Sequence, residues 1–67
     1  MSEKIEDSIV ELLQNNKEEM FIAEIAKHLN LSSATVSKNL GILEAKGRVI
    51  SRIRKPYKLY RAKGLLG

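Results

Sequence analysis

The chain has 67 residues, of which 43% are hydrophobic and 30% are charged, and this is the composition of one small globular domain. It contains no cysteine, which excludes disulfide bonds and thiolate metal sites. No apolar run approaches the roughly 20 residues that span a bilayer, and residues 1–20 do not have the pattern of a signal peptide. We therefore expect a single domain over residues 1–67, located in the cytoplasm and without a cofactor.

The charge of the chain is divided unequally between its two halves. Residues 1–31 contain three lysines and seven acids, which gives a net charge of −4. Residues 32–67 contain nine lysines and arginines and one acid, Glu44, which gives a net charge of +8. Such a distribution can be a solvated surface that is basic by chance, but a small domain with one strongly basic end usually binds a polyanion.

Residues 3–16 have the apolar spacing of a helix. Four apolar residues from Ile5 to Leu13 stand at positions i, i+4, i+7 and i+8, so they form one stripe on a helix surface. Val10 lies about 120° from the centre of that stripe. We expect Val10 to pack against a later element or against a partner.

A second apolar period predicts a helix over residues 22–30. Its apolar residues run from Ile22 to Leu29 with the spacing i, i+3, i+4 and i+7. Residues 20–21, directly before it, are apolar and can make a short extended segment.

The third predicted helix spans residues 33–46. Ser32 is a good N-cap, and Leu31 and Val36 have the spacing of a hydrophobic staple around it. Gly47 stands where a glycine usually ends a helix. This helix is the one that the sequence specifies best.

After the third helix the apolar period changes from 3.6 to 2. Residues 48–62 are rich in β-branched and aromatic side chains on both sides of Pro56, so they predict a two-stranded hairpin with its tip at the proline. A tail over residues 63–67 follows without a periodic signal. The link over residues 30–32 is so short that the second and third helices must meet at a sharp corner, as in a helix-turn-helix.

Three helices followed by a hairpin predict a mainly α, α+β fold, the winged helix-turn-helix. The run from Ile22 to Ile50 resembles bacterial and archaeal transcription regulators of the ArsR and MarR type, and the resemblance covers roughly residues 5–62. It implies that the helix over residues 33–46 enters the major groove of DNA. It also implies that the wing over residues 52–58 lies along the backbone or in the minor groove.

The chain departs from these families in two ways. ArsR-type metal sensors carry clusters of cysteine or histidine, whereas this chain has no cysteine and one histidine, so no metal site is implied. MarR-type proteins dimerise through long terminal helices that this chain lacks. Dimerisation by that route is therefore not implied either.

The outward face of the third helix is predicted to carry small and polar side chains, which suit a DNA groove. Serine and threonine can bond to base edges or phosphates, and Lys38 can reach a guanine or a phosphate. An ordinary solvated face usually carries acids, and here none comes before Glu44. The candidate DNA contacts of this helix are Ser32, Ser33, Ala34, Thr35, Ser37, Lys38 and Asn39.

The hairpin tip carries a cluster of cations around its proline. Charges on an edge hairpin can serve to prevent aggregation, but glutamate would do this equally well and none is present. Phosphate or minor-groove contact is therefore the preferred interpretation. Tyr57 and Tyr60 can stack on bases, although a tyrosine in a strand more often belongs to the core. The candidate DNA contacts of the wing are Arg52, Arg54, Lys55 and Lys58.

Gly41 lies in the interior of the third helix, where glycine costs about 1 kcal/mol relative to alanine. Two interpretations are open. Either a phosphate or a partner protein approaches the helix closely at this point, or the helix is stabilised elsewhere and tolerates the glycine.

These features predict a sequence-specific protein that binds double-stranded DNA and regulates transcription. An enzyme is not expected, because the i, i+4 pair of His28 and Ser32 has no third catalytic partner and so small a domain offers little pocket. Two alternatives are a winged-helix module that binds another protein and an architectural protein that coats DNA without sequence preference.

One recognition helix reads only a few base pairs, so we expect a homodimer that places two such helices on one site. The apolar residues that the small core has least room for are Val10, Leu65 and Leu66. These three residues are the candidate dimer interface.

Overall fold

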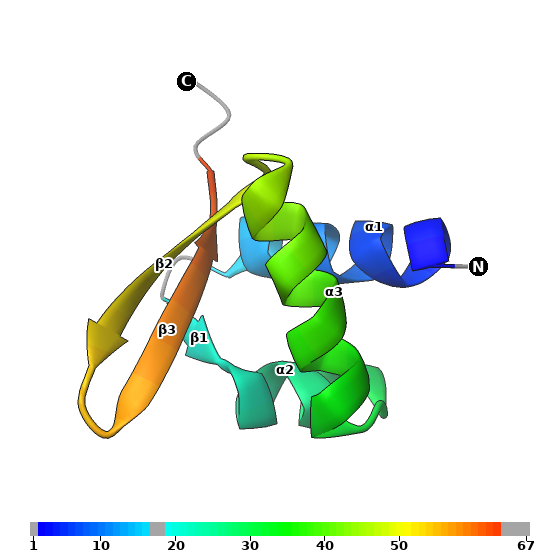
Figure 1. The fold of residues 1–67 in the computed structure, drawn as a ribbon. Coiled ribbons are helices and arrows are strands. Elements are labelled where there is room, and N and C mark those ends of the chain that lie inside the picture. The colour runs from blue at the N-terminus through cyan, green and yellow to red at the C-terminus, as the bar shows by residue number, and fades with distance from the viewer. Residues whose placement is uncertain (1, 17–18, 64–67) are drawn as a thin grey trace.

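The structure, a computed structural model, describes residues 2–16 and 19–63. Its elements follow the order of a winged helix, with three helices packed on one side of a small antiparallel sheet (Figure 1). The predicted fold class, α+β and mainly helical, is confirmed. The elements are α1 (Ser2–Asn15), β1 (Met20–Phe21), α2 (Ile22–Leu29), α3 (Ser33–Ala45), β2 (Val49–Arg54) and β3 (Tyr57–Ala62).

The sheet has three strands in the order β1-β3-β2, one more than the predicted hairpin. The short extended segment before α2 is the third strand, with Met20 opposite Tyr60 and Phe21 opposite Leu59. Its pairing covers part of the outer edge of β3, where backbone groups would otherwise lack partners. The prediction of two strands was therefore incomplete, because a two-residue strand has no periodicity of its own.

Both ends of α2 are stabilised, although no Ser, Thr, Asp or Asn stands at the N-cap position. The backbone N–H of Phe21 donates to Glu24 Oε1 at 3.1 Å, so the acid of the first turn supplies the acceptor. The helix ends at Asn30, which adopts the left-handed conformation with φ 57°. These two features place the sharp corner before α3.

The start of α3 has the predicted cap. Ser32 Oγ accepts a hydrogen bond from the backbone N–H of Thr35 at 3.1 Å. At the other end Gly47 has φ 75°, and the N–H of Arg48 donates to the carbonyl of Leu43 at 2.9 Å. This arrangement is typical of a helix that ends on a glycine.

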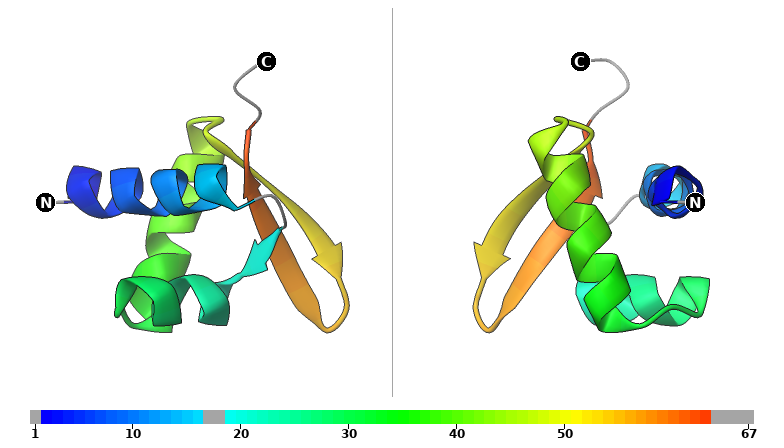
Figure 2. Two further views of the ribbon diagram at one scale, coloured as in Figure 1. Left: turned by 180° about the vertical axis from the view of Figure 1, so that it is seen from behind. Right: turned by 45° about the vertical axis from the view of Figure 1, so that its right-hand side comes forward.

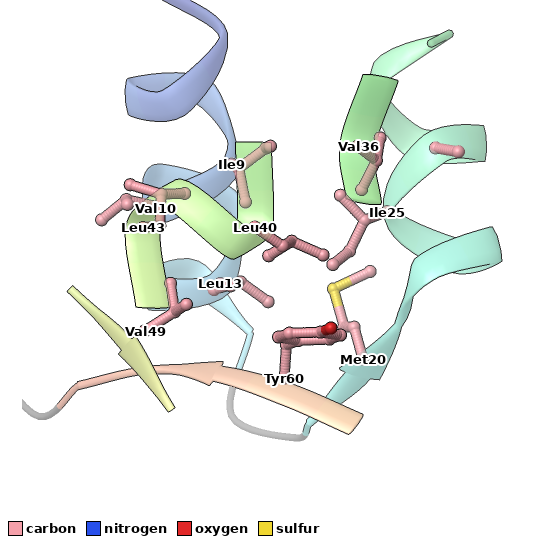
Figure 3. Packing of buried hydrophobic residues seen from close by; sticks show 11 residues of the cluster. Ile9, Val10, Leu13, Met20, Ile25, Val36, Leu40, Leu43, Val49 and Tyr60 are labelled. Atoms are coloured by element: carbon pink, nitrogen blue, oxygen red, sulfur yellow. The ribbon is translucent and has the colours of Figure 1, made fainter. Parts of the chain in front are cut away.

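One buried cluster joins all the helices to the sheet. Ile9 of α1, Ile25 of α2 and Leu40 of α3 have no exposed surface, and the sheet contributes Met20, Val49 and Tyr60 (Figure 3). In the close view Val36 of α3 lies beside Ile25, at the corner between α2 and α3. The burial of Tyr60, at 5% exposure, excludes it from contact with bases.

Val10 belongs to this core and is only 5% exposed. The sequence placed it off the apolar stripe of α1, where it could pack against a later element or serve a dimer, and the structure shows the first. Helix α1 contacts both α3 and β3, so two of its sides are covered and the buried face is wider than one stripe. The described surface therefore does not offer Val10 to a second chain.

An ion pair between a buried carboxylate and a half-exposed lysine connects α1 to the end of α3. Glu6 is 3% exposed, and its Oε1 accepts from Lys46 Nζ at 2.9 Å. Sequence reasoning assigned Lys46 to the last turn of a helix and gave Glu6 no role. The pair supplies the buried carboxylate with a counter-charge, without which its burial would be unfavourable.

Within the described residues, no helix is long and apolar enough to cross a membrane.

Replacing Lys46 by methionine is expected to lower the free energy of unfolding by about 1–3 kcal/mol, because Glu6 is then buried without a counter-charge. Urea unfolding followed by circular dichroism measures the change. The double variant Glu6→Gln with Lys46→Met should recover part of the loss, since the amide carries no charge. A double variant less stable than Lys46→Met would contradict this account of the pair.

Candidate nucleic-acid interface

The surface of α3 that faces away from the core carries small and polar side chains. Ser33, Ala34, Ser37 and Lys38 are exposed, and Thr35 is half-buried. None of these described residues is acidic. The face therefore has hydrogen-bonding groups and one cation, with little side-chain bulk to hinder approach of a groove.

Two of the predicted contacts also hold the helix start together. Ser32 Oγ accepts from the Thr35 backbone and donates to Thr35 Oγ1 at 2.9 Å. Both residues remain near the surface. Their hydroxyl groups are therefore already oriented by the cap, which fixes their positions on the candidate interface.

Asn39 must be removed from the predicted contact set, because the structure buries it at 5% exposure. Its Nδ2 donates to the Thr35 carbonyl at 2.8 Å, while its Oδ1 has no partner among the described residues. At 100° per residue, position 39 lies only about 40° from the inward position 43 and about 60° from position 36. Its polar character suggested an exposed residue, but its helical position places it inward.

The sheet register divides the predicted wing cations between two faces. Lys58 is opposite Ile53 and shares the side of Tyr60, which faces the helices. Arg52 is opposite Leu59 and Arg54 is opposite Tyr57, so both arginines lie on the other side of the sheet. Lys55 is in the turn between the strands. The four cations are close in sequence, but they do not form one patch.

Acids hold two of these cations in place. Arg52 forms an ion pair with Glu19 at 2.6 Å, and Lys58 lies 3.9 Å from Glu44. Glu44 also accepts a hydrogen bond from Ser51 Oγ at 2.6 Å. Glu44 thus links α3 to both long strands.

The remaining candidate cations are not paired in this way. Lys38, Arg54 and Lys55 form no ion pair with an acid in the described part of the chain. In all three ribbon views the hairpin tip and the first turn of α3 lie at the same end of the molecule (Figures 1 and 2). These features make that end the candidate nucleic-acid interface.

Sequence reasoning missed the acids that organise this surface. The sequence contained a hint that Glu44 organises this surface, because it is the one acid among residues 32–67. It contained no such hint for Glu19, since its partner Arg52 is 33 positions away and only the sheet topology brings them together. Asp7 likewise pairs with Arg48 at 3.2 Å across a long sequence distance.

Two further points concern metal ligands and the predicted dimer interface. In residues 2–16 and 19–63 no group of three or more His, Cys, Asp or Glu side chains is placed to hold a metal ion. Leu65 and Leu66, predicted for the dimer interface, lie outside the described residues.

The profile of a family described as "HTH domain" matches residues 6–60. The chain belongs to this helix-turn-helix family. The family membership agrees with the corner between α2 and α3. None of the comparisons assigns the chain to the ArsR or MarR type.

Two solved structures have the same fold. The Zalpha domain of Carassius auratus PKZ, in complex with Z-DNA, superposes with a TM-score of 0.84 at 24% identity, covering 92% of this chain and 97% of that chain. The apo Zalpha domain of zebrafish PKZ superposes with a TM-score of 0.84 at 22% identity, covering 91% and 94%. No curated protein sequence matches significantly. At these identities the similarity establishes the winged-helix fold.

Gly41 lies on the exposed face of α3, and a Cβ built there meets no atom within 4 Å. Gly41→Ala is therefore expected to raise the free energy of unfolding by about 1 kcal/mol, measured by urea denaturation. The matched variant Gly47→Ala should lower it by about 1–2 kcal/mol, because Gly47 has a left-handed backbone with φ 75°. A destabilised Gly41→Ala protein would show that the glycine is needed for folding.

Proposed function

We propose that this chain binds double-stranded DNA and regulates transcription, with α3 in the major groove and the wing tip on the backbone. The observation that carries the proposal is the exposed face of α3, which presents hydroxyl groups and Lys38 and has no acid before Glu44. Membership of the HTH family supports DNA binding. The Zalpha domain of Carassius auratus, which shares the fold, was crystallised with Z-DNA.

The distribution of charge supports the same docking. Lys38 and Lys55 are exposed and are not held by described acids, so phosphates can approach them without breaking an ion pair. Lys58 faces the helix side of the sheet, within reach of a duplex seated on α3. By contrast, Arg52 is directed to the opposite side and is bound by Glu19.

We further propose that two copies occupy one DNA site in the cytoplasm of the cell. A single recognition helix contacts too few base pairs to select one site in a genome. Because Val10 is in the core, the contact between copies must use other residues. A stoichiometry of two chains per selected site supports this arrangement, and a stoichiometry of one contradicts it.

Duplex binding is expected to weaken steeply with salt, because phosphate contacts release counterions. With three or four phosphates neutralised per chain, the slope of log K against log salt should be about −3 to −4. Fluorescence anisotropy with a labelled duplex measures this slope. The experiment compares three duplexes: one of random sequence, one of selected sequence, and one of alternating CG sequence in the left-handed form. A slope near zero would overturn DNA binding and favour the protein-interaction module, whereas equal affinity for all duplexes would favour an architectural protein.

Lys38 and Lys55 are expected to contribute differently to binding. Lys38→Ala should cost about 1–3 kcal/mol on a preferred sequence and relax preference at one base pair, because it lies on the helix in the groove. Lys55→Ala should weaken all sequences about equally, because a wing lysine contacts phosphate. Lys27→Ala, an exposed lysine on α2, is the charge-matched control. Altered sequence preference in Lys55→Ala with none in Lys38→Ala would contradict the docking.

A further inference from the structure

The face of the sheet that points away from the helices is not covered by any described element. In Figures 1 and 2 all three helices lie on one side of the sheet, and the other side is open. The register places Phe21 opposite Leu59, Arg54 opposite Tyr57 and Ile50 opposite Arg61 on this open side. None of the described strand residues is acidic, although Glu19, directly before β1, forms an ion pair with Arg52 on this side of the sheet. We call this surface the outer sheet face.

The outer sheet face carries an exposed aromatic stack. The rings of Phe21 and Tyr57 are 4.8 Å apart between centroids and inclined by 23°. Tyr57 remains 54% exposed although Phe21 covers part of it. A tyrosine held in this way is preordered by its neighbour and still has surface on which another flat ring can stack.

A shallow groove lies beside this stack at the hairpin tip. It is lined by Phe21, Arg54, Lys55, Pro56, Tyr57 and Leu59. The lining therefore combines an aromatic platform with two cations that no described acid binds. Farther along the same face Arg61 and Ile50 are both exposed.

We propose that the outer sheet face binds single-stranded nucleic acid, separately from the duplex surface of α3. One base stacks on Tyr57, and the backbone phosphates follow Arg54, Lys55 and Arg61. Single-strand binding surfaces combine these two components, because every base has a flat face and every linkage a negative charge. An acidic peptide would satisfy the cations alone and would leave the exposed ring without a matching group.

The two surfaces lie on opposite sides of one sheet, since Tyr60 and Lys58 face the helices while Tyr57 and Arg61 face away. Among the described cations of the hairpin tip, Arg54 is directed to the outer sheet face, and Lys55, in the turn, is available to both. The chain can therefore hold a duplex on α3 and a single strand on the sheet at the same time. This arrangement fits a junction where a duplex opens into a single strand.

Fluorescence anisotropy of labelled decathymidylate, which forms no duplex, tests the proposal at low salt. We expect saturable binding that Tyr57→Leu weakens by about tenfold and Tyr57→Phe retains, because stacking needs the ring and not the hydroxyl. Arg61→Gln should reduce the magnitude of the salt slope by about 0.7, whereas Lys27→Gln, a charge-matched change on α2, should leave it unchanged. Circular dichroism checks that each variant is folded.

Three results would overturn the proposal. The first is the absence of saturable decathymidylate binding by the unaltered chain. The second is equal affinity of the Tyr57→Leu and Tyr57→Phe variants. The third is competition by decaglutamate as effective as that by unlabelled decathymidylate, which would indicate a site for acidic peptides. Duplex binding by Tyr57→Leu, measured in parallel, should be unchanged, so failure here is distinguishable from failure of the duplex surface.

Discussion

The position of every candidate contact depends on the complete burial of one face of α3. Val36, Leu40 and Leu43 have no exposed surface, and they pack against α1, α2 and the sheet. Once these three side chains are inward, the rotation of the helix about its axis is determined, and Gly41 and Lys38 must face solvent. The hydrophobic core therefore sets the orientation of the surface proposed to contact DNA.

The unequal charges of the two halves have two separate roles in the folded chain. At the end of α3 the acids of α1 are ion-paired with Lys46 and Arg48, so part of the charge difference joins these elements. At the hairpin tip Lys55 has no described acidic partner, and the first turn of α3 carries no acid. Ion pairs therefore neutralise part of the charge at one end, and Lys55 remains available to an anion at the other.

The helices, the corner and the hairpin could be predicted because each depends on local features such as apolar period, an N-cap and Gly47. Which side chains are exposed on the candidate nucleic-acid interface could be predicted only in part. Asn39 is polar, yet its position on the helix buries it, and Val10 is buried because α1 is covered on two sides. The division of the wing cations depends on strand register, and the pair of Glu19 with Arg52 depends on topology. The burial of Asn39 follows from helical spacing, whereas the other three are properties of the assembled fold for which spacing along the sequence carries no signal.

The composition of α3 shows how folding and recognition are separated within one helix. Its exposed positions include the weak helix formers Ser33, Ser37 and Gly41 beside better ones such as Ala34 and Lys38, so intrinsic propensity alone does not account for its stability. The helix instead depends on its apolar stripe, the Ser32 cap and the terminal Gly47. Because those supports lie on the inward face and at the two ends, the outward side chains of Ala34, Ser37 and Lys38 are not part of them. Side chains there can be selected for what they contact, and a short helix can therefore be both firmly placed and chemically adaptable.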